Sequence, residues 1–159
     1  MINVVGATFS ALAAALESEL LADIPLARAM ALKASAYDGD SLTLAAPLAP
    51  NVNDKGCAFG GSLASLMTLA GWGLIKLAVD ARALDCDIYV QDSSIRYLAP
   101  IWQDFAAVAR PAAGESFDDF FAALAARGKA RMSVHCVVPL ADGAAAATLD
   151  ARFVAFVKR

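Results

Sequence analysis

The sequence predicts an α+β domain in which an antiparallel sheet of five to six strands wraps around one long central helix. A run of small and apolar residues over about 61–78 is apolar on nearly every side, which predicts a helix that must be enclosed. Most of the remaining chain alternates apolar and polar residues in short segments between turn residues, a pattern typical of antiparallel strands. The order of helix, hairpin, long helix and further strands disfavours a parallel sheet.

The first element expected is a helix over about residues 8–22, where apolar residues recur at helical spacing. Thr8 or Ser10 can cap its start, and Asp23-Ile24-Pro25 ends it. We expect this helix on the outside of the sheet or over its end. Residues 29–37 and 42–48 then alternate on either side of a turn, which predicts a hairpin.

Strands are expected to dominate the chain after the central helix. Residues 85–99 read as one long strand, kinked or bulged near Asp92-Ser93-Ser94, and 105–110 as another. Ser116 caps a short helix that Gly128 stops. The last two expected elements are strands over residues 129–140 and 148–158, which flank an alanine-rich turn.

The composition predicts a single domain over residues 1–159 that associates with further copies of itself. No break in composition divides the chain. Hydrophobic residues make up 59% of it and the mean hydropathy is +0.56, which is high for a soluble monomer of this size. We therefore expect apolar surface to be buried between subunits, in a homodimer or a dimer of dimers.

Charge and cysteine usage exclude several classes of protein. A formal net charge of -3 without a Lys/Arg cluster disfavours nucleic-acid binding. Cys57, Cys86 and Cys136 are widely spaced and form no CxxC, so we expect neither a disulfide framework nor a zinc site, and we expect a cytoplasmic protein. The first residues lack a basic region and soon reach Glu17 and Glu19, so we read them as mature protein rather than as a signal peptide.

The most informative stretch runs from Asn51 to Leu77. Its first part, Asn53-Asp54-Lys55-Gly56, is polar and turn-forming, and Gly60-Gly61-Ser62 then opens the long apolar run. Roughly twenty residues before Lys76 carry no charge, which is about the length that spans a bilayer. The glycines and the loop-like start favour a helix inside a soluble domain, so no membrane association is expected.

This stretch resembles the hotdog-fold acyl-CoA thioesterases, in which a curved antiparallel sheet wraps one long helix. The segments NDKGCAFGGSLASLMTLAGWGL and QDSSIRYLAPI are similar to the subgroup of the YiiD C-terminal type. In the phenylacetate-pathway branch of the family, an Asn is followed six positions later by His-Gly-Gly, and an acidic residue lies nine positions beyond the His. Asn53, Gly60 and Gly61 match that pattern, but Phe59 replaces the His and Thr68 replaces the acid.

The resemblance implies hydrolysis of a thioester at the start of the central helix. Unpaired N–H groups at Gly60-Gly61 can stabilise a developing oxyanion, although the glycines can also serve only close packing. Asn53 can orient water or the carbonyl group, or it can be an ordinary turn residue. Phe59, at the position of the family's His, is a candidate substrate contact. Further candidate substrate contacts are Ser62, Ser65 and Ser94.

The general base is the open question in the sequence. The Thr68 hydroxyl can position water but cannot act as a base near neutral pH, and it can instead bond to the carbonyl one turn earlier. Asp54 and Asp92 are the candidate carboxylates, and each has a solvated surface role as its alternative. Asp92 lies in the strand that pairs with its copy in hotdog dimers, so we expect it near the neighbouring helix N-terminus. A Ser-His-Asp hydrolase is disfavoured, because no GxSxG motif is present and His135 lies far along the chain.

These observations predict a thioesterase that acts on acyl-CoA or acyl-carrier thioesters by general-base attack of water. The alternative is a hotdog module that binds an acyl group or CoA without catalysis. A dehydratase of the same fold is disfavoured, because the loop before Gly60 has no His. No cofactor and no metal are expected.

Overall fold

The computed structural model describes residues 4–159 and contains four α-helices, one 3-10 helix and six strands in this part of the chain. The elements follow in this order: α1 (Val4–Asp23), α2 (Pro25–Ala29), β1 (Lys33–Tyr37), β2 (Leu42–Ala46), η1 (Ala49–Asn51), α3 (Gly60–Asp80), β3 (Cys86–Tyr97), β4 (Phe105–Pro111), α4 (Phe117–Arg127), β5 (Lys129–Pro139) and β6 (Ala145–Val157).

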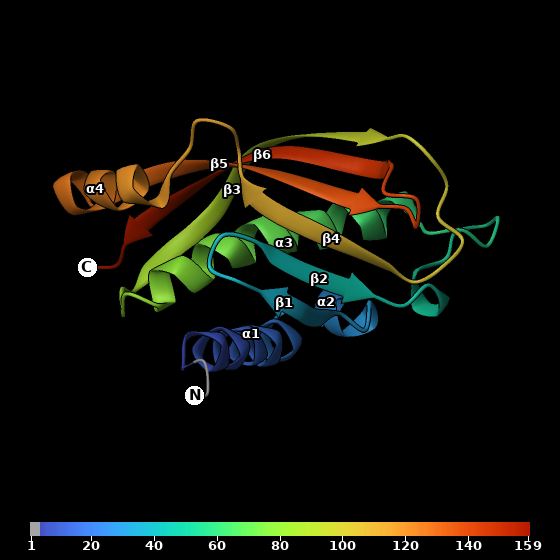
Figure 1. Ribbon diagram of the computed structural model, residues 1–159, viewed down its shortest axis with the longest axis horizontal. Coiled ribbons are helices and arrows are strands. Elements are labelled where there is room, and N and C mark those ends of the chain that lie inside the picture. Colours follow the sequence, from blue (N-terminus) through green and yellow to red (C-terminus); the bar gives the residue numbers. More distant parts are fainter. Residues whose placement is uncertain (1–3) are drawn as a thin grey trace.

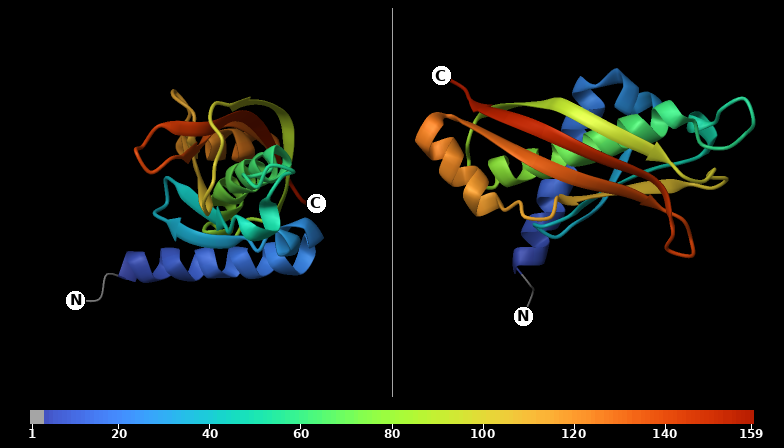
Figure 2. Two further views of the ribbon diagram at one scale, coloured as in Figure 1. Left: turned by 90° about the vertical axis from the view of Figure 1, so that its right-hand side faces the viewer. Right: turned by 90° about the horizontal axis from the view of Figure 1, so that it is seen from above.

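The six strands form one sheet that curls around α3, which confirms the predicted architecture (Figures 1 and 2). The strand order is β1-β2-β4-β5-β6-β3, and every neighbouring pair is antiparallel. α3 is the one helix in the described chain that is long and apolar enough to cross a membrane. Because most of it is buried against the sheet, its composition is that of a core helix.

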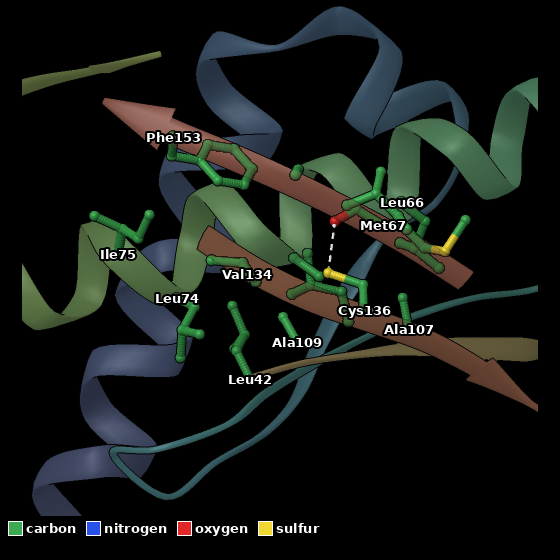
Figure 3. Packing of buried hydrophobic residues seen from close by; sticks show 14 of the residues in the cluster. Leu42, Leu66, Met67, Leu74, Ile75, Ala107, Ala109, Val134, Cys136 and Phe153 are labelled. Carbon is green, nitrogen blue, oxygen red and sulfur yellow. Dashed lines mark hydrogen bonds between the residues drawn. The ribbon is translucent and has the colours of Figure 1, made fainter. Parts of the chain in front are cut away.

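The core lies between α3 and the concave face of the sheet. Figure 3 shows Met67 and Leu74 of α3 among side chains from β2, β4, β5 and β6. The Cys136 thiol of β5 donates a hydrogen bond to the Met67 carbonyl oxygen, with a sulfur-oxygen distance of 3.3 Å. Phe153 of β6 is fully buried over α3. Helix and sheet are therefore joined by packing along the middle of α3.

The first helix is longer than the sequence predicted. α1 begins at Val4, so the two proposed caps, Thr8 and Ser10, lie within the helix instead of at its start. It ends at Asp23 as expected, and Pro25 opens α2, where its missing N–H is not needed. Figure 2 shows α1 lying along the outside of β1.

A carboxylate of α1 accepts a hydrogen bond from the backbone at the outer edge of β1. Oε2 of Glu17 accepts a hydrogen bond from the Ala34 backbone N–H at 2.9 Å. The hairpin itself is confirmed, with an irregularity in register between Ala34 and Ala36. α1 therefore covers one end of the sheet.

β3 forms the opposite end of the sheet, and its outer side has no neighbouring strand in residues 4–159. The predicted bulge is present between Val90 and Asp92. Several large side chains of this strand are exposed, including Tyr89 and Val90. The two edges of the sheet thus differ: one is covered by α1 and the other is open.

The C-terminal elements follow the prediction except at the last turn. The Ser116 hydroxyl accepts the Asp119 N–H at 3.1 Å, and Gly128 ends α4 with a φ of 66°. The alanine-rich segment was expected as a turn, but Ala145 already belongs to β6. The Ala146 carbonyl oxygen accepts the N–H groups of Leu98 and Ala99, so this segment is held as an ordered strand. Ala145 also lies opposite Pro139 of β5, so pairing with neighbouring segments fixes this strand, although a run of alanines has a low intrinsic strand propensity.

Candidate functional site

The N-terminus of α3 is a helix end that no side chain caps. Phe59 occupies the N-cap position in an extended conformation, and its side chain makes no capping hydrogen bond. The first turn of a helix leaves backbone N–H groups without intrahelical partners and carries partial positive charge. In α4, by contrast, Ser116 supplies the cap. The start of α3 therefore keeps donors available for an acceptor from outside the helix.

Two aromatic rings flank this first turn. A Cβ at Gly61 would overlap the Phe59 ring, and a Cβ at Gly60 would lie 3.4 Å from the Tyr97 ring. The Tyr97 hydroxyl donates a hydrogen bond to the Gly60 carbonyl oxygen at 3.2 Å. Both rings are about half exposed. The two glycines thus allow aromatic side chains to lie directly against the helix backbone.

Asn53 organises the loop that leads into α3. Its Oδ1 accepts the N–H groups of Lys55 at 2.8 Å and Cys57 at 3.2 Å, and its Nδ2 donates to the Cys57 sulfur at 3.1 Å. The Phe59 N–H then donates to the Asn51 carbonyl oxygen at 2.7 Å. In this arrangement the Asn53 amide bonds within its own turn, so it fixes the path by which the chain enters the helix.

The hydroxyl groups of α3 bond to the helix backbone. Ser65 donates to the Gly61 carbonyl oxygen and Thr68 to the Ala64 carbonyl oxygen, both at 2.8 Å. This is the local pattern that Ser and Thr adopt inside helices. Ser62 lies half-buried in the first turn between them and Gly60.

The two candidate carboxylates lie in different places. Asp54 is exposed in the loop before α3 and pairs with Lys55 at 3.0 Å. Asp92 pairs with Arg152 at 2.8 Å and lies opposite it in the register of β3 and β6. Since Arg152 alternates with the buried Phe153, this pair faces away from α3.

Ser94 shares the outer face of the sheet with Asp92. It lies opposite Asp150, whose carboxylate is 2.7 Å from Nδ1 of His135. The structure therefore gathers the loop residues, Phe59, the two glycines and the serines of α3 at one end of the molecule, and places Asp92 and Ser94 on the other side of the sheet. Among the described residues, no group of three or more His, Cys, Asp or Glu is arranged to hold a metal ion.

An apolar pocket of about 360 Å³ adjoins Gly60. Its lining residues come from the end of the loop, the start of α3 and the chain after β3: Ala58, Gly60, Leu63, Tyr97, Leu98, Ala99, Pro100 and Ile101. A larger cavity of about 670 Å³ lies at the ends of β2, β4 and β5 but includes no residue of α3. The smaller pocket is the one next to the available helix N–H groups.

Of the residues that line this pocket, the sequence indicates Gly60 but not Tyr97 or the others. The signal was present, because Ile95 and Tyr97 alternate in phase along β3 on the side that faces α3. Tyr97 lies in the segment QDSSIRYLAPI, but nothing local in that segment indicates that the hydroxyl reaches residue 60, 37 positions earlier.

Comparisons with known proteins agree with this fold. A family model described as "Putative thioesterase (yiiD_Cterm)" matches residues 13–157. A solved structure described as a "putative thioesterase", from Shewanella oneidensis, is 29% identical with a TM-score of 0.81, covering 94% of this chain and 99% of that chain. A protein of unknown function from Chlorobaculum tepidum is 26% identical with a TM-score of 0.87, covering 94% and 97%. A Pseudomonas aeruginosa protein described as a "probable thioesterase", at 24% identity and a TM-score of 0.76, covers 91% and 96% and supports the fold alone.

Proposed function

Since the chain belongs to the hotdog-fold family described as "Putative thioesterase (yiiD_Cterm)", we propose that it hydrolyses acyl-CoA or acyl-carrier thioesters. The main support from the structure is the uncapped, glycine-opened start of α3 beside an apolar pocket. That arrangement offers hydrogen-bond donors to a carbonyl oxygen and an apolar surface to the acyl group. A site of this kind is suited to reactions in which an acyl carbonyl becomes an oxyanion.

In the proposed reaction, water adds to the carbonyl carbon of the thioester while a base accepts its proton. The backbone N–H groups of Gly61 and Ser62 stabilise the oxyanion that forms. The carbon–sulfur bond then breaks, and the thiolate leaves and takes up a proton. The products are a carboxylic acid and a free thiol.

We assign the base to Asp54, the one carboxylate on the loop that leads into α3. Asn53 holds the backbone of that loop, so it acts in this proposal as a positioning residue. Thr68 serves to position water. Asp92, which faces the other side of the sheet, is the competing assignment and is tested in parallel.

We further propose a homodimer formed through the open edge of β3. The exposed side chains Tyr89, Val90 and Tyr97 follow this edge, and an uncovered strand of 12 residues offers unpaired backbone groups to a second copy. Pairing of two β3 strands would bring the start of each α3 closer to the other subunit. Three free cysteines in the described chain fit a reducing compartment, and we place the dimer in the cytoplasm.

The test of the reaction is a panel of acyl-CoA esters with detection of the free thiol released. Turnover of at least one ester above the uncatalysed rate supports the thioesterase. The second candidate function is a non-catalytic binding module. CoA esters that raise the melting temperature of the protein without being hydrolysed would indicate this function.

A further inference from the structure

Resting on the proposed function, we propose that the pocket beside Gly60 selects uncharged, apolar acyl groups, and that Tyr97 is a specificity-determining residue of this site. The proposal goes beyond thioester hydrolysis because it names the chemical class of the acyl group. It depends on the walls of the pocket, on the position of the Tyr97 ring and on the charge of the lining residues.

The floor of the pocket is apolar and fixed in place. Ala58, Leu63 and Ile101 are all nearly fully buried. The Ala58 N–H donates to the Ile101 carbonyl oxygen at 2.8 Å, which joins the loop before α3 to the chain after β3. The N–H of Ala99 is held by the Ala146 carbonyl oxygen at 3.1 Å. These backbone bonds prevent the walls from widening freely for a larger group.

Tyr97 forms the side of the pocket nearest the helix N-terminus. Its ring lies against Gly60, and its hydroxyl is anchored on the Gly60 carbonyl oxygen at 3.2 Å. An acyl group whose carbonyl oxygen meets the N–H groups of the first turn must therefore pass along this ring. Because the ring is part of the pocket lining, removing it would leave a bound chain more exposed to solvent.

No charged side chain is among the residues that line the pocket. A carboxylate at the far end of an acyl group would lose hydration there and gain no ionic partner, which is costly. The pocket volume, about 360 Å³, also lies near the lower end of the range for ligand sites, roughly 300–1,000 Å³. Small apolar acyl groups fit these two conditions, and acyl groups that end in a carboxylate do not.

The test measures binding with CoA thioethers, which cannot be hydrolysed. Titration calorimetry compares free CoA, S-butyl-CoA and the same thioether ending in a carboxylate. We expect S-butyl-CoA to bind about tenfold or more tightly than the carboxylate-ended thioether, in the range that small hydrophobic differences give. Equal or tighter binding of the carboxylate-ended thioether would overturn the proposal.

Two variants with matched controls locate the effect in this pocket. Ala99→Leu should weaken S-butyl-CoA binding by about tenfold by filling the pocket, whereas Ala106→Leu, in β4, should not. Tyr97→Ala should reduce the preference for the apolar thioether, Tyr97→Phe should keep it, and Tyr89→Ala, an equally exposed tyrosine of β3, should leave it unchanged. An unchanged preference in Tyr97→Ala contradicts the assignment of this residue.

Failure of the proposed function is distinguishable from failure of this inference. If no acyl-CoA ester is hydrolysed but the thioethers bind with the expected preference, the thioesterase proposal fails and the pocket assignment stands. If esters are hydrolysed but neither the preference nor the Ala99→Leu effect is observed, the pocket assignment fails and the thioesterase proposal stands.

Discussion

Gly71 of α3 lies directly under the ring of Phe153 in β6: a Cβ at this glycine would lie 2.8 Å from the ring's Cε2 atom. Real Cβ atoms essentially never approach another heavy atom so closely, and Phe153 is fully buried, so its ring cannot turn aside into solvent. The distance between the central helix and the sheet is therefore set by the absence of a side chain at residue 71.

Gly71→Ala should destabilise the protein. Alanine gains about 1 kcal/mol in helix propensity, but overpacking against a rigid ring costs about 1–3 kcal/mol and outweighs it. We expect a net loss of up to about 2 kcal/mol in the free energy of unfolding, measured with urea. Gly73→Ala is the comparison, because there the neighbours are the ends of Leu16 and Leu42 side chains, and its loss should be smaller. Greater stability of Gly71→Ala would contradict this account of the packing.

Gly61→Ala should impair turnover more than stability. The new methyl group would overlap the Phe59 ring, and this ring, being 54% exposed, can swing away over the helix start. We expect a melting temperature within a few degrees of the parent. We also expect a loss of roughly tenfold or more in kcat/KM, because the displaced ring obstructs the N–H donors at the helix start and losing an oxyanion donor costs about 10²–10³-fold. The double variant Phe59→Ala, Gly61→Ala removes the clash and should recover part of the activity. No recovery would indicate that the methyl group itself obstructs the site.

The carboxylate variants test the identity of the base. General-base catalysis contributes about 10²–10⁴-fold, so Asp54→Asn should lower kcat by that order on an ester that the parent hydrolyses. Asp92→Asn should have little effect, because Asp92 faces away from α3, and Thr68→Ala should cost less than Asp54→Asn. Circular dichroism controls for folding. Full turnover by both Asn variants would exclude the carboxylate mechanism.

The stability of the protein should fall at alkaline pH because of Cys136. Burial raises the pKa of this thiol from 9.0 to about 12. Between these values the unfolded state loses the proton while the folded state keeps it, so the stabilisation present below pH 9 is lost as the pH rises toward 12. We expect the free energy of unfolding to fall by up to about 1.4 kcal/mol per pH unit above 9, relative to Cys136→Val. Parallel curves for parent and variant would show that this thiol does not contribute.

A charge on the open sheet edge should reduce self-association. Val90 of β3 is 46% exposed, and lysine on an edge strand opposes pairing with another strand. We expect the parent to be a dimer by light scattering at micromolar concentration and Val90→Lys to shift toward monomer, with Leu26→Lys on α2, whose side chain is 53% exposed, as the control. A monomeric parent would contradict the proposed dimer.

The fold was largely predictable because its strongest signals are local. The all-round apolar character of α3, the turn after β1 and the cap at Ser116 each lie within one short segment. The errors concern segments fixed by distant partners. α1 extends beyond its apparent caps, and Ala145 joins β6 because it pairs with Pro139 of β5, while the chain after β3 bonds to the neighbouring Ala146.

The candidate site was only partly predictable for the same reason. The glycines at the start of α3 are visible as a motif. The face of the sheet on which Asp92 lies, however, depends on the bulge in β3 and on the register that places Asp92 opposite Arg152. The contact of Tyr97 with Gly60 joins residues 37 positions apart. Motif spacing identifies the helix end, whereas the choice among surrounding side chains requires the sheet.

The hydrogen bond from the Ala34 N–H to Glu17 limits how many copies of the protein can join through their sheet edges. A domain with two unprotected sheet edges can add copies at both and grow into a fibre. With one edge occupied by α1, copies that join through β3 leave no free edge for a third. Such growth is self-limiting, and Glu17→Ala together with a shortened α1 would remove the stop at the first edge.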